Sequence, residues 1–506
     1  MDSNFLPLFV AVPLAAAFLT PLVSKFWPKL ADVIGNAVGA VLLGLSAYGL
    51  LYLVTGTESL VYWVGGWRPV PGLPPLGIAM VYDRLSALVV LVTNIVGFCA
   101  LLYSVRYLDH FTARWKFYTL FMLILAGMNG LLISGDLFNM FVFLEISAIA
   151  SYALVAFGTE AEELEAGFKY MVLGEVGGAA ILFGIALLYA QASTLNLADL
   201  GRQLAGIGQT PLFWFAVGTL LLGFAVKMAM VPFHSWLPDA HPSAPAPVSA
   251  FLSGVFIKVA GVYAMSRLVF NVFDLSRATA PVFFDLLVGF GLVSIVAGGL
   301  LANAQRDYKR LLAYSSISQI GYVLLGLGIG TEWAVIGALF HVAAHGLAKG
   351  LLFLGSGAVE MQAGTRDLDR LSGLETKMPA TAWSHVLGSL SLAGVPPFAG
   401  FFSKLFIVLG AIQARMYWVA VVAVLFSGVT LAYLTKVTHK AFFRRQGTEP
   451  TPAREAPGTM VAAMIVLVVL SVLAGLAFQP LVAGVFRPAA EVLLNGLGYA
   501  RMVLGG

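Results

Sequence analysis

Five charged side chains lie inside long apolar stretches of this sequence. They are one glutamate and four lysines: Glu145, Lys227, Lys258, Lys349 and Lys404. A charged group at the centre of a helix in hydrocarbon costs about 3 kcal/mol on insertion scales, so such residues normally face a bundle interior or a water-filled path. Because a lysine can gain and lose a proton and a carboxylate can hold that proton nearby, this set points to charge movement through a membrane.

Lys227 begins a run that ends at His241 and contains Pro232, so the helix that carries the lysine should open there. Glu145 has no other charge on its own predicted helix and is the candidate partner of Lys227. Two alternatives stay open for the pair: a lysine that reaches the membrane interface from near its helix end, and a purely structural ion pair. His234, in the same run, and His241 are additional candidates.

His341, His345 and Lys349 recur every four residues and therefore project along one slowly drifting stripe of a helix. Histidine passes protons near neutral pH, so the stripe predicts a proton relay in the membrane plane. A structural histidine is the alternative for either residue. Two histidines at this spacing could also bind a metal ion, but no third ligand is near in the sequence, so no metal site is expected.

Three other buried charges would extend this path. Lys258 would connect the first lysine to the histidine stripe, and Lys404 would end the path in the second half of the chain. Glu175 follows Gly174 in a further apolar stretch. Its role is open between pairing with a lysine of this chain and pairing with a basic group of a partner subunit.

The composition is that of a membrane protein, with 59% hydrophobic and 11% charged residues among 506. Apolar runs of about 20 residues, each able to cross a bilayer, recur along the chain. They predict an all-α polytopic protein with fourteen spans, near residues 4–23, 33–55, 84–104, 117–135, 137–157, 168–191, 212–232, 245–271, 282–303, 312–330, 333–358, 381–411, 416–437 and 458–483.

Charge in the loops predicts the topology. Of the 29 basic residues, 17 fall in alternate loops and 8 on the opposite side. Since Lys and Arg collect in cytoplasmic loops, both termini should lie outside the inner or plasma membrane. The net charge of +4 follows from these loops and does not indicate nucleic-acid binding. A single cysteine, Cys99, argues against cysteine-ligated iron–sulfur or zinc sites in this chain, and we expect no cofactor.

No long soluble insert interrupts the spans, which predicts one membrane domain over residues 1–506. Prolines should break the seventh span at Pro232 and the twelfth at Pro396 and Pro397, each beside a buried lysine. The odd offset between these spans predicts two inverted five-span repeats, 117–271 and 282–437, between an N-terminal segment 1–116 and a final segment 458–506. Gly65 to Pro75 predicts an irregular or hairpin-like external segment, and Phe486 to Gly506 a short interfacial helix.

Six runs together resemble the antiporter-like subunit family shared by Mrp-type cation/proton antiporters, respiratory complex I and membrane-bound hydrogenases: 134–145, 194–200, 227–241, 307–318, 341–353 and 394–404. The first three are most similar to the D-type subunit of Mrp antiporters and its hydrogenase relatives. The resemblance implies that Glu145 and Lys227 form the charge pair of a first half-channel. It makes Lys258 and the histidines a connecting relay and Lys404 the terminal lysine. Glu175 departs from the pattern, which has a neutral residue there.

The predicted function is proton translocation within a larger complex, with other membrane subunits as partners. Whether the protons are exchanged for Na⁺ stays open. A proton-pumping subunit of a complex I-like oxidoreductase or a hydrogenase is the second interpretation. A stand-alone transporter of an organic solute and an assembly scaffold with silent channels are the remaining ones. A subunit should purify with several membrane partners, whereas a transporter should purify alone or as a homo-oligomer.

Overall fold

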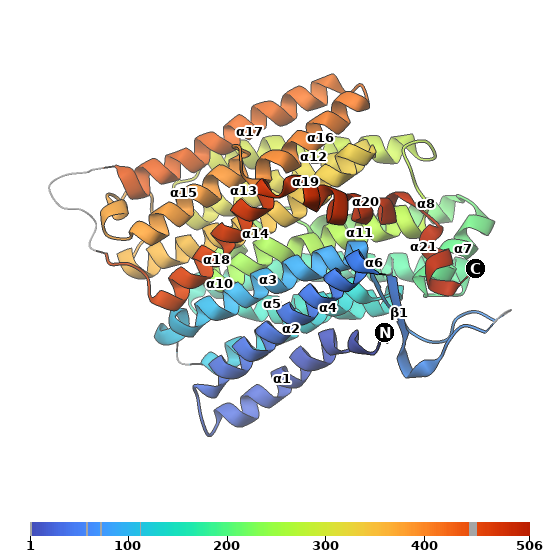
Figure 1. Ribbon diagram of the computed structural model, residues 1–506, viewed down its shortest axis with the longest axis horizontal. Helices are drawn as coiled ribbons and strands as arrows, with labels where there is room; N and C mark the ends of the chain where they lie inside the picture. Colours follow the sequence, from blue (N-terminus) through green and yellow to red (C-terminus); the bar gives the residue numbers. More distant parts are fainter. Residues whose placement is uncertain (1–2, 57–58, 71–72, 112, 445–452, 506) are drawn as a thin grey trace.

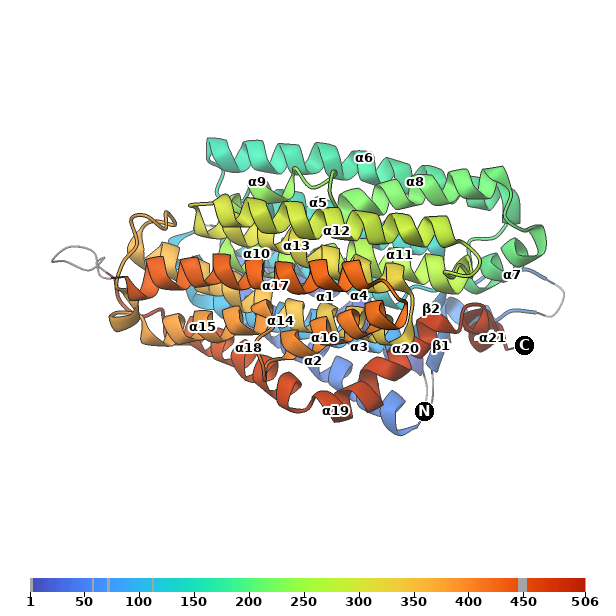
Figure 2. The ribbon, with the colours of Figure 1, turned by 90° about the horizontal axis from the view of Figure 1, so that it is seen from above.

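The computed structural model describes residues 3–56, 59–70, 73–111, 113–444 and 453–505, and most of these residues are helical. The helices pack side by side along a common direction (Figures 1 and 2). Twelve of the described helices are long and apolar enough to cross a membrane, or thirteen if a bent pair near the C-terminus counts as one. The chain is therefore an all-α polytopic membrane protein, as the composition predicts.

The long helices follow the predicted apolar runs. Their bounds are α1 Leu8–Ser24, α2 Leu30–Thr55, α3 Arg84–Tyr107, α4 Arg114–Ile133, α5 Leu137–Val155, α6 Ala161–Ala192, a span Ala246–Val272 that includes α10 (Ala246–Phe251) and α11 (Ala264–Ser266), α12 Pro281–Ala304, α13 Tyr308–Ile329, α14 Glu332–Ala363, α17 Tyr417–Val437 and α18 Gly458–Leu476.

Both predicted helix breaks are present. The seventh predicted span is α8 (Pro211–Lys227), which ends before Pro232 and is followed by α9 (Leu237–Ser243). The twelfth is divided into α15 (Pro379–Ala393) and α16 (Ala399–Gln413), with the two prolines between them. A proline ring cannot continue the helical hydrogen-bond ladder, so these segments stay shorter than the twelve continuous spans. The total of fourteen crossings stays a prediction.

The end of the bundle that holds both described chain ends also holds a hairpin (Figure 1). Its strands, β1 (Ser59–Trp63) and β2 (Ala79–Asp83), are antiparallel, with Ser59 opposite Asp83. These strands flank the segment predicted to be irregular or hairpin-like, in which Pro71 lies outside the described residues. The single interfacial helix predicted near the C-terminus is instead two, α20 (Arg487–Leu494) and α21 (Gly498–Leu504), because the chain bends by 97° between them.

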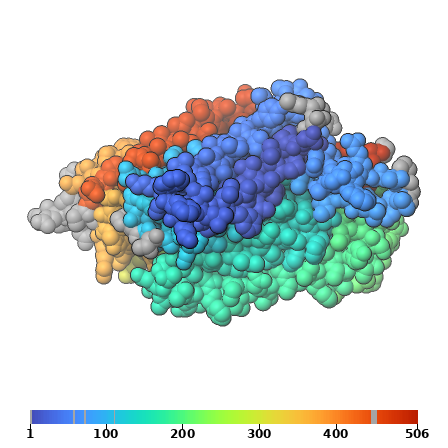
Figure 3. Space-filling view, turned by 90° about the horizontal axis from the view of Figure 1, so that it is seen from below, coloured from blue at the N-terminus to red at the C-terminus, as the bar shows by residue number. Residues whose placement is uncertain are grey.

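The remaining short helices are α7 (Leu197–Ile207) and α19 (Phe478–Leu481). Burial divides the bundle into an interior and a rim. The Ala246–Val272 span and α14 are buried throughout their most apolar windows, whereas most of the corresponding windows of α1, α2 and α18 are not buried. Figure 3 shows the blue N-terminal part of the chain on one face, and Figure 2 places α6 along an outer edge. The helices that carry Lys258 and the histidine stripe therefore form the interior.

Two isolated β-bridges show a regularity along the chain. One joins Asp136 to Asn196, and the other joins Asp307 to Asp367, so the second bridge repeats the first 171 positions later. Helices α6 (161–192) and α14 (332–363) also begin and end 171 positions apart. A constant offset of this kind is what an internal repeat produces. The inverted orientation of the two halves and the proposed segment boundaries stay predictions.

Candidate functional site

Glu145 and Lys227 meet in the first half of the bundle. Lys227 Nζ lies 3.0 Å from Glu145 Oε1 and 3.4 Å from the hydroxyl of Tyr152. The lysine side chain is 1% exposed and that of the glutamate 16%. Glu145 and Tyr152 both come from α5. Sequence reasoning misses the tyrosine, because a tyrosine in an apolar run resembles an ordinary packing residue.

The position of Lys227 follows from the helix break. It is the last residue of α8, where the peptide dipoles and unpaired carbonyl groups favour a cation. Trp236 holds the opened chain in place because its Nε1 donates a hydrogen bond of 2.9 Å to the carbonyl of Val226. The indole also stacks on Tyr170, with ring centroids 4.2 Å apart. His234 lies half-buried within this opened segment.

Two serine hydroxyls and three backbone carbonyls lie between Lys258 and Lys349. Lys258 Nζ donates to the carbonyls of Ser253 (2.6 Å) and Gly254 (2.7 Å) on its own helix. The hydroxyl of Ser253 lies 2.7 Å from that of Ser316, which donates to the carbonyl of Leu312 at 2.9 Å. Lys349 Nζ donates to the same carbonyl at 2.6 Å.

Polar contacts thus lead from the Ala246–Val272 span across α13 to α14, with backbone carbonyls next to each lysine. Neither serine is a candidate from the sequence, although Ser316 lies within the 307–318 run. In the part of the chain that the structure describes, no direct hydrogen bond joins the side chains of Lys258 and Lys227. The predicted bridge between these two lysines therefore stays a prediction.

The histidine stripe is buried as predicted. The rings of His341 and His345 have centroids 5.9 Å apart. His341 Nδ1 lies 2.9 Å from Ser403 Oγ, on the helix that carries the last lysine. Within the described part of the chain, both ring nitrogens of His345 and of His241 are buried without a hydrogen-bond partner. Buried polar atoms of this kind are usually satisfied by water, which would make these histidines contacts of a water-filled path.

Lys404 lies at the second helix break. Its Nζ donates to the carbonyls of Leu392 (3.0 Å) and Ala393 (3.3 Å), which α15 leaves unpaired where it ends. It also lies 3.3 Å from Ser427 Oγ and 4.8 Å from the ring centroid of Tyr322. The lysine therefore provides hydrogen-bond donors for carbonyl groups at the break that hydrocarbon could not solvate, and these carbonyls in turn stabilise the buried cation.

The 171-position offset relates the two polar regions. Glu145 corresponds to Ser316, and Gly178 on α6 corresponds to Lys349 on α14. Gly178 faces the carboxylate so closely that a methyl group there would lie 2.6 Å from Glu145 Oε1. The first half thus places a carboxylate beside a small residue, whereas the second half places a hydroxyl beside a lysine.

Glu175 lies on the exposed side of α6, among exposed apolar residues that include Val172 and Val176. Its carboxylate is within electrostatic range of Glu145 and Lys227. Among the described residues, however, no lysine nitrogen lies within 4.0 Å of the Glu175 carboxylate to form an ion pair. An exposed carboxylate on an apolar helix is consistent with the predicted partner subunit.

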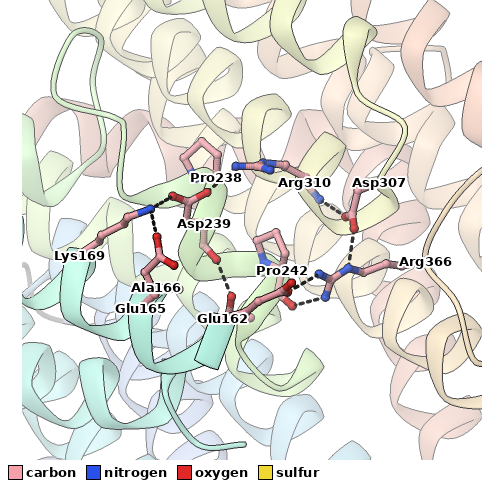
Figure 4. Close-up of a pocket in the computed structure, with 11 residues that line it drawn as sticks. Glu162, Glu165, Ala166, Lys169, Pro238, Asp239, Pro242, Asp307, Arg310 and Arg366 are labelled. Carbon is pink, nitrogen blue, oxygen red and sulfur yellow. Dashed lines mark hydrogen bonds and ion pairs between the residues drawn. The ribbon is translucent and has the colours of Figure 1, made fainter. Parts of the chain in front are cut away.

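A charged cavity of about 350 Å³ is lined by residues from α6, α9 and α13 and by Arg366 (Figure 4). It lies at the end of the bundle opposite the chain termini, where α6 begins. Asp239 on α9 pairs with both Lys169 (3.2 Å) and Arg310 (2.5 Å). Arg366 pairs with Asp307 at 2.5 Å and donates to the carbonyl of Pro242 at 2.9 Å. This cavity lies beside the helix that carries His241. No local sequence pattern indicates it, because its residues come from separate segments of the chain.

Comparison with known proteins identifies the group of proteins to which this architecture belongs. The profile described as NADH:quinone oxidoreductase/Mrp antiporter, TM, matches residues 134–430, which include all of the candidate residues above. The chain belongs to this family. A second profile, NADH-ubiquinone oxidoreductase (complex I), chain 5 N-terminus, matches residues 67–118.

Members of the NADH:quinone oxidoreductase/Mrp antiporter family resemble the chain over almost its whole length. The N-type subunit of NADH-quinone oxidoreductase from Desulforudis audaxviator is 35% identical, covering 97% of this chain and 99% of the relative. The D-type subunit of the Na⁺/H⁺ antiporter from Alkalihalophilus pseudofirmus is 32% identical, covering 97% of each. One component of the Mrp complex from Dietzia sp. DQ12-45-1b superposes with a TM-score of 0.90 at 28% identity, covering 99% of both.

Proposed function

We propose that the chain is a proton-translocating, antiporter-like subunit of a multisubunit membrane complex, most like the D-type subunit of Mrp Na⁺/H⁺ antiporters. The observation that carries this proposal is the buried contact of 3.0 Å between Lys227 and Glu145 at the end of a broken helix. A buried ion pair seldom stabilises a protein more than apolar packing would, so its presence in a membrane bundle favours a functional role. The opened chain beside it gives a proton a route to the pair.

The remaining candidates extend the path from this pair. Water beside the Ser253 and Ser316 hydroxyls would carry protons between Lys258 and Lys349, because the carbonyl groups that both lysines contact cannot pass a proton on. His345 and His341 carry protons toward Lys404. Support comes from the polar contacts that lie between the two lysines and from the buried ring nitrogens that lack partners among the described residues. His241 and His234 are additional members of the path.

The sidedness follows from the loop charges. We assign the cavity around Asp239 to the cytoplasmic side, because it lies at the end of the bundle where the basic loops meet. Both termini then lie outside the plasma membrane. The constant 171-position offset supports an internal repeat. We place the two repeats near 117–271 and 282–437, flanked by segments 1–116 and 458–506 of one membrane domain.

A second candidate function is proton pumping in a complex I-like oxidoreductase or a membrane-bound hydrogenase. The specific observation in its favour is the 35% identity to the N-type subunit of an NADH-quinone oxidoreductase. The antiporter and the redox-driven pump would use the same proton path in this chain, so the two functions differ only in the partner subunits that drive it. A redox arm would drive the path in one direction, whereas a cation gradient would drive an antiporter.

Purification and flux measurements separate these functions. The chain is purified from its native membrane with a mild detergent, and the copurifying subunits are identified by mass spectrometry. Proton flux is then measured in vesicles driven by a Na⁺ gradient or by a redox substrate. Antiport predicts small membrane partners and flux driven by Na⁺. A chain that purifies alone and moves no protons under either condition would refute both functions.

A further inference from the structure

A second cavity, of about 660 Å³, lies at the end of the bundle that holds the chain termini. It is formed between the start of α3 and the two C-terminal helices α20 and α21. Its charged groups come from Arg84, Arg501 and Glu491, whereas its border includes the apolar side chains of Leu494 and Met502. Leu494 is 40% exposed, which is consistent with a cavity that faces the membrane surface.

Arg84 has no acidic partner among the described residues, although an aspartate precedes it. The carboxylate of Asp83 is bound by Arg267 at 2.8 Å and accepts a hydrogen bond of 2.8 Å from the amide of Ser86. Within the described part of the chain, Arg84 Nε is buried without a hydrogen-bond partner. A buried guanidinium nitrogen with unused donor capacity favours an external acceptor.

Arg501 supplies the second cation of this cavity. It is exposed on α21 and forms no ion pair with the residues that the structure describes. The guanidinium is planar, presents several donors and matches a phosphate group well. Two guanidinium groups that line one cavity suit a phosphate, either as a lipid phosphodiester or as free phosphate.

Glu491 limits what this phosphate can be attached to. Its exposed carboxylate lines the same cavity and would repel a purely anionic ligand, but it would attract an ammonium group. A head group that combines a phosphate with a primary ammonium satisfies all three side chains. The apolar border and the amphipathic helices at this end of the bundle suit the start of the acyl chains.

We propose that this cavity binds the head group of phosphatidylethanolamine, with its phosphate at Arg84 and Arg501 and its ammonium at Glu491. The lipid would fix α20 and α21 against the start of α3. This inference does not rest on the proton path, but its test uses the multisubunit complex of the proposed function.

The test uses the complex purified with its membrane partners and stripped of lipid in detergent. Short-chain phosphatidylethanolamine, short-chain phosphatidylglycerol and inorganic phosphate are titrated separately by calorimetry. The variants are Arg84→Gln, Arg501→Gln and Glu491→Gln. The matched control is Arg202→Gln, because this exposed arginine lies on α7, which packs on α21 but does not line the cavity.

Each arginine variant should weaken phosphatidylethanolamine binding by about tenfold or more, since a hydrogen bond to a charged group is lost, and the control should bind as the wild type. Glu491→Gln should remove the preference for phosphatidylethanolamine over phosphatidylglycerol. Arg501 is exposed and lies near the chain end, so Arg501→Gln should still fold and can test the site if Arg84→Gln does not fold.

Three outcomes would overturn the proposal. The first is wild-type binding of phosphatidylethanolamine by both arginine variants. The second is inorganic phosphate bound as tightly as the lipid, which would identify a free-anion site. The third is loss of a partner subunit in the arginine variants while the wild type binds no lipid, which would identify a protein interface.

Discussion

Replacing Glu145 by glutamine tests the ion pair with little change in shape. The amide can still accept a hydrogen bond from Lys227, but it carries no charge. At a separation of 3.0 Å and an effective dielectric of about 20, the lost Coulomb energy is about 5 kcal/mol. Removal of one partner from buried pairs costs roughly 3 to 5 kcal/mol.

We therefore expect the charged form of Lys227 to be destabilised by roughly 3 kcal/mol or more in Glu145→Gln, which corresponds to about a hundredfold in an equilibrium constant. Proton flux in vesicles should fall by a similar factor, because the lysine no longer holds its proton at the break. The complex should still assemble, since the side chain keeps its volume. Lys227→Ala should also abolish transport.

Glu165→Gln is the matched control. Glu165 pairs with Lys169 at 2.7 Å, but both side chains are about half-exposed or more. Such surface pairs contribute about 0 to 1 kcal/mol, so this variant should transport at the wild-type rate. Flux is compared at equal membrane abundance, with assembly checked by the copurified partners. Near-normal flux in Glu145→Gln would refute the role of the pair in translocation.

Three further predictions concern the rest of the path. Lys404→Arg keeps the charge but does not release a proton, so it should block vesicle flux as fully as Lys404→Ala; substantial flux would mean that the lysine is only a fixed charge. His345→Ala and His341→Ala should each slow flux while leaving the thermal unfolding midpoint nearly unchanged, and an unaltered rate in the double variant would place the relay elsewhere. Gly178→Ala should reduce flux with all charges intact, because its methyl group would meet Glu145 Oε1 at 2.6 Å and displace the carboxylate; wild-type flux would show that the position of that carboxylate is unimportant.

The membrane class, the buried charges and the two helix breaks can all be predicted from the sequence. Apolar runs must become helices in a bilayer because every backbone polar group needs a partner there, and proline removes such a partner at a fixed place. The four-residue spacing of His341, His345 and Lys349 also requires a shared stripe once the helix is predicted. These features depend on local chemistry, which a single sequence carries.

Which groups meet depends on the packing of the helices. Ser253 and Ser316 lie far apart in the sequence, yet their hydroxyls meet between Lys258 and Lys349. Serine is common in helices and gives no signal of its partners, because its hydroxyl can also bond to its own backbone. The cavities depend likewise on residues from separate helices. Contacts between distant segments arise from how the helices pack, and one sequence does not specify that packing through any local pattern.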